Sequence, residues 1–144
     1  MKTTGNTILT TGGGSGIGWM QAQRFNALGN AVIVAGRRAE ALKETIAGRR
    51  DMYAVVVDVD DPAQITELAR RVVAEHPALN VLVNNAGIMR REDLTRKRDL
   101  SDAEHTVITN LLAPIRLTNE LIDHLVAQPD SAIVNVSSGL ASYR

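Results

Sequence analysis

Short apolar runs alternate with segments of helical periodicity along the whole chain. Five of these runs are rich in Val and Ile without strict polar alternation, which is typical of strands covered on both faces. They predict strands over Asn6–Thr10, Ala31–Ala35, Tyr53–Val57, Val81–Asn84 and Ala132–Ser137. Because a helical segment separates each strand from the next, we expect parallel strands joined by right-handed crossovers. The pattern therefore predicts an α/β fold with a doubly wound, mostly parallel sheet of about five strands.

The first two helical segments are predicted from their apolar spacing and from the glycines that follow them. In the first, Ile17, Phe25 and Leu28 fall on one face of a 3.6-residue wheel, and Gly29 follows as a stop. This face is expected to pack on the sheet. Trp19 points away from it and is expected to be partly exposed. A shorter helix is predicted after the second strand.

The other two helical segments carry recognisable start signals. Asp61 followed by Pro62 is a good N-cap and first-turn pair for the third helix. The fourth begins at Ser101 with Glu104 three residues later, which is the spacing of a capping box. Its periodicity continues to Leu125, so a long helix is expected, interrupted by Pro114. The mixed-sign stretch before it predicts a solvated loop.

Composition narrows the class of protein. A chain of 144 residues, 44% of them hydrophobic, can form one domain with a substantial core, expected to span residues 1–144. The absence of cysteine excludes disulfides, zinc-thiolate sites and thiol catalysis, and no metal site is expected. Sixteen basic residues balance sixteen acidic ones, which argues against a general nucleic-acid binder. With no long apolar run and no secretory signal, we expect a cytoplasmic protein without a membrane partner.

A glycine-rich segment, Thr11–Gly18, lies between the first predicted strand and the first helix. Glycines let the backbone turn tightly and approach a ligand, and free N–H groups at a helix start favour phosphate. Trp19 and Met20 stand where a Walker loop needs Lys and Ser or Thr, and the G-x-G-x-x-G spacing is also absent. The pattern that fits is T-G-x-x-x-G-x-G, through Gly12, Gly16 and Gly18. A plain turn without a ligand remains the alternative.

The glycine-rich segment resembles the cofactor loop of the short-chain dehydrogenase/reductase family, which has a Rossmann-like fold. Four further motifs of that family recur in order: Asp58-Val59, Asn84-Asn85-Ala86-Gly87, Asn110, and Val134-Asn135-Val136-Ser137-Ser138. More specifically, the stretches 110–118 and 133–141 resemble the DltE-type branch of the family. The resemblance covers essentially the whole chain and implies a carbonyl or alcohol as small-molecule substrate.

The resemblance implies a set of cofactor-binding residues, most of them at predicted strand ends. Ligands of doubly wound sheets bind outside the carboxyl ends of the strands, at the switch point. The implied residues are Gly12, Gly14, Ser15, Gly16, Ile17, Gly18, Arg37, Arg38, Asp58, Val59, Asn84, Asn85, Ala86 and Gly87. Two simpler interpretations stay open: Asp58 as a cap for the third helix, and the two asparagines as turn residues.

The end of the second predicted strand indicates which nucleotide is bound. NAD-specific sites place an acidic residue there to bind the ribose 2′-hydroxyl, whereas this chain has Arg37 and Arg38 and no carboxylate before Glu40. Guanidinium groups bind a 2′-phosphate with paired hydrogen bonds. We therefore expect NADP(H) to be preferred over NAD(H), although Ser15 stands where many NADP-dependent relatives carry a basic residue. Two surface arginines that open a helix are the alternative.

Two residues are candidates for the chemistry itself. Pro114 has no N–H, so the Asn110 carbonyl loses its usual helical partner, and in the family that carbonyl holds a water of the proton relay. A purely structural kink is the alternative. By resemblance, Ser138 is the catalytic serine, with Ser137 as a neighbour that could be mistaken for it. The three histidines are expected at surface or helix-end positions: His76, His105 and His124.

The family pattern breaks near the end of the chain. The family's Y-x-x-x-K motif is not found beyond Ser138, no lysine follows Lys97, and Tyr143 lies too close to the serine to match. The family's last strands and helices are also missing, which leaves the strand at Ala132–Val136 as an open edge and predicts a homo-oligomer. Two interpretations follow: an incomplete NADP(H)-dependent oxidoreductase, or a non-catalytic nucleotide-binding or interaction module.

Overall fold

A computed structural model describes residues 2–138 of the chain. They form a five-stranded parallel sheet with the strand order β3-β2-β1-β4-β5. The elements in chain order are β1 (Thr7–Thr11), α1 (Gly16–Ala27), β2 (Ala31–Gly36), α2 (Ala39–Ile46), β3 (Met52–Val56), α3 (Pro62–Glu75), β4 (Leu79–Asn84), α4 (Ser101–Val107), the π-helical turn η1 (Ile108–Leu112), α5 (Ala113–Val126) and β5 (Ala132–Asn135). The predicted doubly wound, Rossmann-like α/β fold is confirmed, with strand ends shifted by one or two residues.

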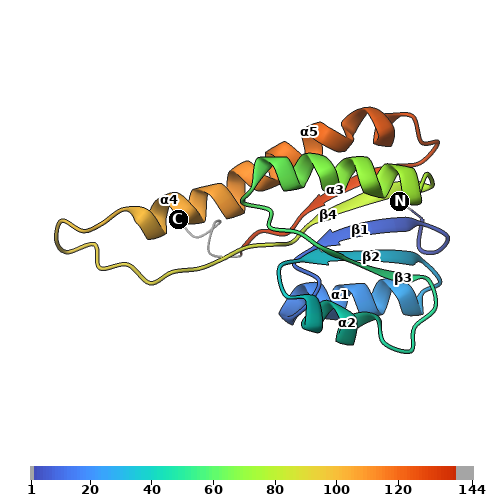
Figure 1. Cartoon of the computed structure of the whole chain (residues 1–144), viewed down its shortest axis with the longest axis horizontal. Helices are drawn as coiled ribbons and strands as arrows, with labels where there is room; N and C mark the ends of the chain where they lie inside the picture. Colours follow the sequence, from blue (N-terminus) through green and yellow to red (C-terminus); the bar gives the residue numbers. More distant parts are fainter. Residues whose placement is uncertain (1, 139–144) are drawn as a thin grey trace.

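Helices cover both faces of the sheet (Figure 1). α1 and α2 lie on one face, and α3 and α5 lie on the other. The chain winds outward from β1 through β2 to β3, then returns to the other side of β1 with β4 and β5. The strand order therefore reverses between β1 and β4, and this switch point is where doubly wound sheets bind ligands.

The sheet is buried on both faces because successive strand residues point to opposite sides. On β2, Ile33 joins the core formed with α3 and α5, whereas Val32 and Val34 join the core formed with α1 and α2. All three side chains are fully buried. This explains why the strands appear in the sequence as unbroken apolar runs.

The predicted apolar face of α1 is confirmed at Phe25, which packs against buried residues of the sheet, and is wrong at Ile17 and Leu28. Ile17 and Leu28 are 57% and 41% exposed, and the buried residues of the helix are Gly18 and Ala22. Ala22 packs in the core with Val32 and Val34, and Gly18 leaves no room for a side chain because a Cβ there would overlap the Gly12 carbonyl of the glycine-rich loop. The predicted stop is confirmed, since α1 ends at Ala27 and Gly29 adopts a left-handed φ of 81°.

Both predicted helix starts are confirmed in position, but only one of the two predicted caps is found. Asp61 caps α3, where its carboxylate accepts a hydrogen bond of 2.9 Å from the Ala63 N–H. The capping box at Ser101 is wrong because Ser101 is already the first helical residue. Its N–H donates to the Asp99 carboxylate at 2.8 Å, so an acidic residue of the preceding loop satisfies this helix end instead.

The long helix predicted from Ser101 is interrupted, as expected, but not by a simple kink at Pro114. Instead the turn before that proline widens into the π-helical turn η1, where the Ala113 N–H donates to the Ile108 carbonyl five residues back. Pro114 lies in the first turn of α5, where a missing N–H is tolerated. The π-turn adds one residue to the helix without ending it.

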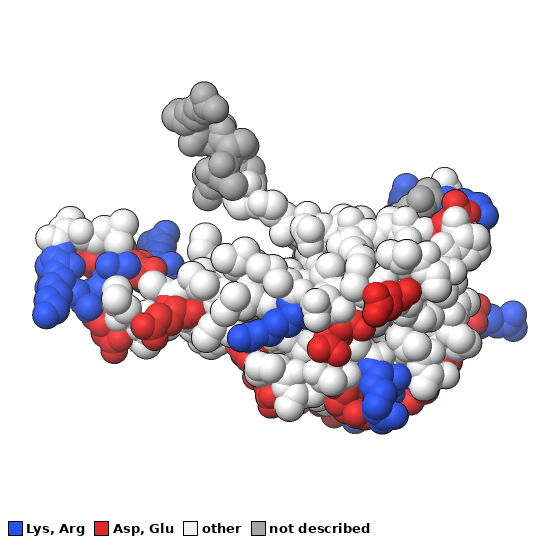
Figure 2. All heavy atoms as spheres, turned by 90° about the horizontal axis from the view of Figure 1, so that it is seen from above, with Lys and Arg blue, Asp and Glu red and all other residues white. Residues whose placement is uncertain are grey.

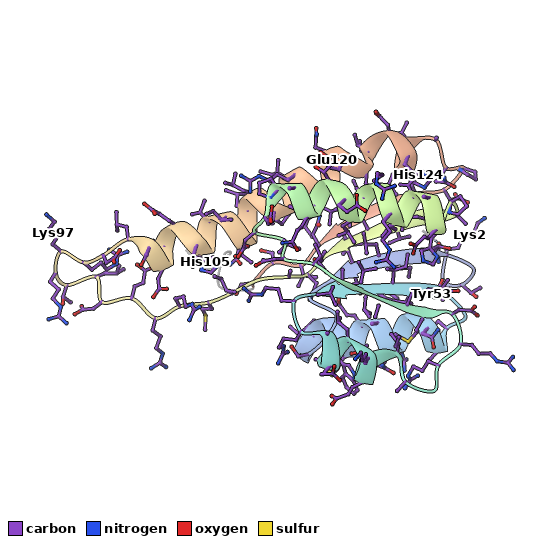
Figure 3. All side chains as sticks on the ribbon, in the orientation of Figure 1. Lys2, Tyr53, Lys97, His105, Glu120 and His124 are labelled. Atoms are coloured by element: carbon purple, nitrogen blue, oxygen red, sulfur yellow. The ribbon has the colours of Figure 1, made fainter. Side chains whose placement is uncertain are left out.

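The segment 85–100 between β4 and α4 contains no helix or strand and extends away from the sheet (Figure 1). It includes the predicted solvated loop. Figure 2 shows Lys, Arg, Asp and Glu side chains intermingled at this end of the molecule. Lys97 lies at its outer end (Figure 3). Within residues 2–138, none of the helices combines the length and apolar character that crossing a membrane requires.

Candidate functional site

Two adjoining grooves open at the carboxyl ends of the strands. The first groove, of about 380 Å³, is bounded by the glycine-rich loop, the ends of β2 and β3, and the segment after β4. The second groove, of about 860 Å³, lies between the end of β5, the segment after β4 and one side of η1 and α5. Both are lined by Asn85, Ala86, Gly87 and Val136, so they form one continuous depression across the switch point.

The glycine-rich loop places backbone against the first groove. Gly12 and Gly16 have left-handed φ values of 69° and 54°, which L-residues with a side chain rarely adopt. A Cβ on Gly12 would lie 2.9 Å from the Asn85 amide nitrogen, whereas a Cβ on Gly16 would meet nothing within 4 Å. The loop is therefore tight at Gly12, where it touches the segment after β4, and open at Gly16.

Most of the loop residues predicted to bind a cofactor line the first groove: Gly12, Gly14, Ser15, Ile17 and Gly18. Gly16 does not line it, but its backbone conformation turns the chain into α1. Ser15 is the N-cap residue of α1, and its side chain caps nothing. The exposure of Ile17, which contradicts the predicted core face of α1, arises because this side chain faces the groove.

Thr11 ties the end of β1 to the segment after β4. Its hydroxyl accepts hydrogen bonds from the backbone N–H groups of Asn85 at 3.1 Å and Ala86 at 3.0 Å. The Asn85 side chain in turn donates to the Thr11 carbonyl at 2.9 Å. The threonine is 3% exposed. These three bonds hold the wall shared by the two grooves against the glycine-rich loop.

Arg37 and Arg38 follow β2 and line the first groove. Within residues 2–138 neither guanidinium takes part in an ion pair or a side-chain hydrogen bond. The carboxylate of Glu40 bonds to Lys43 at 2.8 Å, one turn further along α2. The groove therefore has two available guanidinium groups at the end of β2.

Asp58 and Val59 also line the first groove, just after β3. The Asp58 carboxylate accepts a 3.1 Å hydrogen bond from the Asp60 N–H, and its own N–H donates to Gln64 at 2.9 Å. Asp61, and not Asp58, caps α3. The alternative interpretation of Asp58 as the cap of α3 is therefore not supported.

Sequence reasoning missed a cluster of three side chains beside the first groove. Thr109 donates to one oxygen of Asp60 at 2.7 Å, and the Nε2 of His105 lies 2.6 Å from the other. Burial opposes ionisation of Asp60, but these hydrogen bonds and the positive charges of His105 and Arg37 outweigh it and lower the pKa of Asp60. His105 lies in the last turn of α4 and its side chain is 39% exposed, so the expected surface or helix-end position is confirmed. Its bond to Asp60 was not predicted, because no short-range signal reveals a pair 45 residues apart.

Asn84 and Gly87 lie on the side of the second groove. Asn84 is 5% exposed and donates to Asn135 at 2.9 Å and to Thr118 at 3.3 Å, so it joins β4 to β5 and α5. It lines the second groove and not the first. Gly87 lines both, and a Cβ there would lie 3.3 Å from the amide oxygen of Asn110.

The two candidates for the chemistry both line the second groove. Asn110, in η1, makes a pair of 2.8 Å bonds to the backbone of Ile88: its oxygen accepts from the N–H and its nitrogen donates to the carbonyl. Ser137 and Ser138 follow β5 on the facing side of the same groove. The fold thus brings Asn110 and Ser138 together from distant parts of the sequence. Tyr143 lies outside the described residues.

No group of three or more His, Asp or Glu side chains in the described part of the chain is arranged to hold a metal ion. The polar groups at the site are instead backbone N–H groups, amides, hydroxyls, two guanidiniums and the carboxylates of Asp58 and Asp60. Such a set suits an elongated ligand with anionic groups at one end and a neutral polar group at the other.

Comparisons with known proteins agree with this geometry. The oxidoreductase DltE of Bacillus subtilis, itself described as uncharacterized, is 41% identical over 142 residues, covering 98% of this chain and 56% of that protein. The NADP-dependent 3-hydroxy acid dehydrogenase YdfG of Escherichia coli O6:H1 is 31% identical over 137 residues, covering 94% of this chain and 55% of that protein. The chain spans about half the length of the curated relatives it matches.

Solved structures of similar fold extend the comparison. A serine dehydrogenase in its closed form, complexed with NADP+, superimposes with a TM-score of 0.88 at 30% identity, covering 95% of this chain and 56% of that one. A short-chain dehydrogenase from Streptomyces avermitilis gives a TM-score of 0.87 at 30% identity, covering 94% of this chain and 50% of that one. The family model described as short chain dehydrogenase matches residues 6–144. The chain belongs to the short-chain dehydrogenase family of oxidoreductases.

Proposed function

We propose that this chain forms the cofactor-binding part of an NADP(H)-dependent oxidoreductase that interconverts a small-molecule carbonyl and an alcohol by hydride transfer. The observation that carries the proposal is the continuity of the two grooves through Asn85–Gly87. A dinucleotide lying across the switch point would have its adenosine end beside Arg37 and its reactive end beside Ser138.

The glycine-rich loop fits a pyrophosphate. Gly16 has open space where a side chain would stand, and its backbone leads directly into α1. The first N–H groups of a helix have no partners within it and carry the positive end of the helix dipole, which favours phosphate. The same loop also packs tightly on Asn85 through Gly12, so this cradle is held in place before a ligand arrives.

Four observations support NADP(H) over NAD(H). Arg37 and Arg38 stand where an NAD-specific site needs a carboxylate, and neither is engaged by an acidic residue within residues 2–138. A guanidinium binds a 2′-phosphate with charge-assisted, paired hydrogen bonds. The relative YdfG is named as NADP-dependent, and the serine dehydrogenase structure holds NADP+.

At the reactive end, the nicotinamide of a bound cofactor supplies or accepts the hydride. Ser138 is proposed to donate a hydrogen bond to the substrate oxygen, which becomes more negative as the carbonyl is reduced. Asn110 uses its side chain to fix Ile88 and the segment after β4. Its backbone carbonyl is proposed to hold a water of the proton relay, because Pro114, four residues later, has no N–H to donate to it.

Calorimetric titration of the chain with NADPH and NADH tests the cofactor. Arg37→Ala is expected to raise the Kd for NADPH roughly tenfold to a hundredfold, with little change for NADH, because a hydrogen bond to a charged group is worth about 1.5–3 kcal/mol. Arg49→Ala, an exposed arginine away from both grooves, is the control. Equal affinity of the parent chain for both nucleotides, or tighter binding of NADH, would contradict the proposed preference.

The proposed chemistry is tested in the full-length protein by following NADPH oxidation with a panel of aldehydes and ketones. Ser138→Ala is expected to reduce turnover by about 10²–10³-fold while leaving the Kd for NADPH within about twofold, because the hydroxyl acts on the developing oxyanion and not on the nucleotide. Ser137→Ala is the matched control. Equal losses in the two variants would show that Ser138 has no special role.

A further inference from the structure

The cluster of Asp60, His105 and Thr109 lies beside the first groove but has no part in the function proposed above. Asp60 and Thr109 line the groove together with Arg37. The Asp60 side chain is 17% exposed and His105 is 39% exposed. The Asp60 carboxylate lies in the same groove as the two guanidiniums, where it competes with an anionic ligand for their positive charge.

Both carboxylate oxygens of Asp60 are occupied by groups from the α4–η1 region. One oxygen accepts from the Thr109 hydroxyl at 2.7 Å, and the other lies 2.6 Å from His105 Nε2. Figure 3 shows His105 leaving α4 on the side that faces the body of the protein. Thr109 is 5% exposed, so its bond is shielded from water. The Asp60 carboxylate is thus held by two side chains, His105 of α4 and Thr109 of η1.

The other charged group facing Asp60 is Arg37. Its positive charge is near enough to favour the ionised carboxylate. Yet Arg37 forms no ion pair with any residue from 2 to 138, and Asp60 bonds to His105 and Thr109 instead. If the Asp60 carboxylate had no other hydrogen-bond partner, we would expect the exposed Arg37 side chain in the same groove to form an ion pair with it.

We propose that His105 is a positioning residue: together with Thr109 it engages Asp60 and so leaves Arg37 available to an anionic group of the nucleotide. This inference rests on the proposed function. The imidazole lies against one oxygen of Asp60 and the Thr109 hydroxyl against the other, so each oxygen open to Arg37 already has a hydrogen-bonding neighbour. The chemical class of ligand that benefits is a nucleotide with an extra phosphate on its adenosine end, because that end lies beside Arg37.

The test compares nucleotides with and without that phosphate in three variants of the full chain. His105→Ala is expected to raise the Kd for NADPH about threefold to fivefold, the effect of one exposed ion pair competing for Arg37, and to leave the Kd for NADH within about twofold. His105→Gln, whose side-chain amide can donate to the same oxygen, is expected to restore the parent ratio. Thr106→Ala, one residue along and without contact to Asp60, is the control.

Removing the carboxylate should abolish the effect. In an Asp60→Asn background, His105→Ala is expected to leave the NADPH-to-NADH ratio of affinities unchanged, because no charge remains to capture Arg37. Raising the salt concentration should shrink the effect of His105→Ala in the parent background, since the competing pair is exposed. Equal weakening of NADPH and NADH by His105→Ala would show that the histidine only supports the fold, and would overturn the proposal.

A measurement without any nucleotide separates this proposal from the proposed function. The coupling between Arg37→Ala and Asp60→Asn is obtained from urea unfolding of the two single variants and the double variant, in the parent and in His105→Ala. A larger coupling after loss of His105 supports the positioning role, even if the parent chain binds NADPH and NADH equally and the proposed cofactor preference fails. An unchanged coupling would refute the positioning role, whichever nucleotide is bound.

Discussion

Replacing Thr11 with valine isolates the contribution of one hydroxyl to the site. Valine has nearly the same shape and the same preference for strands, so the backbone of β1 is not perturbed. The substitution removes the acceptor for two backbone N–H groups, those of Asn85 and Ala86, at 3.1 and 3.0 Å. The neighbouring Thr10 is a natural control: it is fully buried, and its hydroxyl has no hydrogen-bond partner among residues 2–138.

The magnitude follows from what each hydroxyl bonds. A buried N–H left without a partner costs about 1–3 kcal/mol. Asn85 and Ala86 are only half-buried, so water reaches them in part and the lower end of that range applies to each. Thr11→Val is therefore expected to lower the free energy of unfolding by about 2–3 kcal/mol. Thr10→Val removes an unpaired polar group from the core and is expected to raise it by up to about 1 kcal/mol.

Urea unfolding, followed by the fluorescence of Trp19 and by circular dichroism, measures both variants against the parent. Trp19 is the only tryptophan of the chain and lies on α1, next to the glycine-rich loop. Thr11→Val should also weaken nucleotide binding, because it releases the wall shared by the two grooves. Similar losses of stability for Thr10→Val and Thr11→Val would refute the reasoning, since only one of the two hydroxyls accepts hydrogen bonds.

Three further predictions follow from single contacts. Asn110→Ala removes both bonds to Ile88 and should lower the free energy of unfolding by about 1–2 kcal/mol in urea unfolding, while weakening nucleotide binding. Leu121→Ala, in a fully buried position of α5, should cost about 2–5 kcal/mol in the same assay. The pKa of Asp60 is lowered from its usual 3.8 in the folded chain. Its stabilising effect should therefore be complete above pH 3.8 and be lost as the pH falls through the lowered pKa. Asp60→Asn should flatten this part of a curve of unfolding free energy against pH.

The sheet was predictable because its signals are local. Buried parallel strands carry continuous Val and Ile runs, and the helices between them are bounded by residues such as Asp61 and Gly29 whose roles depend on neighbours a few positions away. For the same reason the strand ends at the switch point were predictable, and with them the groove-lining residues that directly follow the strands.

The predictions that failed depend on distances across the fold. The fully buried residues of α1 are Gly18, packed on the glycine-rich loop, and Ala22, packed on the sheet, and a wheel that counts only large apolar residues cannot detect them. The pairing of Asp60 with His105 joins two segments that are separated along the chain by β4 and the long loop. Such contacts depend on how α4 is oriented, which the spacing of its residues does not specify.

The π-turn η1 sets the rotational phase between the two halves of the long helix. Thr109 in this turn faces Asp60, whereas Leu117, Leu121 and Leu125 of α5 face the core. Each residue of a helix advances the face by about 100°, so one extra residue rotates the first half relative to the second by about that angle. The α4–η1 stretch can therefore face the grooves while α5 faces the core. Deleting a single residue within 108–112 would restore one continuous phase and turn the groove-facing side chains away from Asp60.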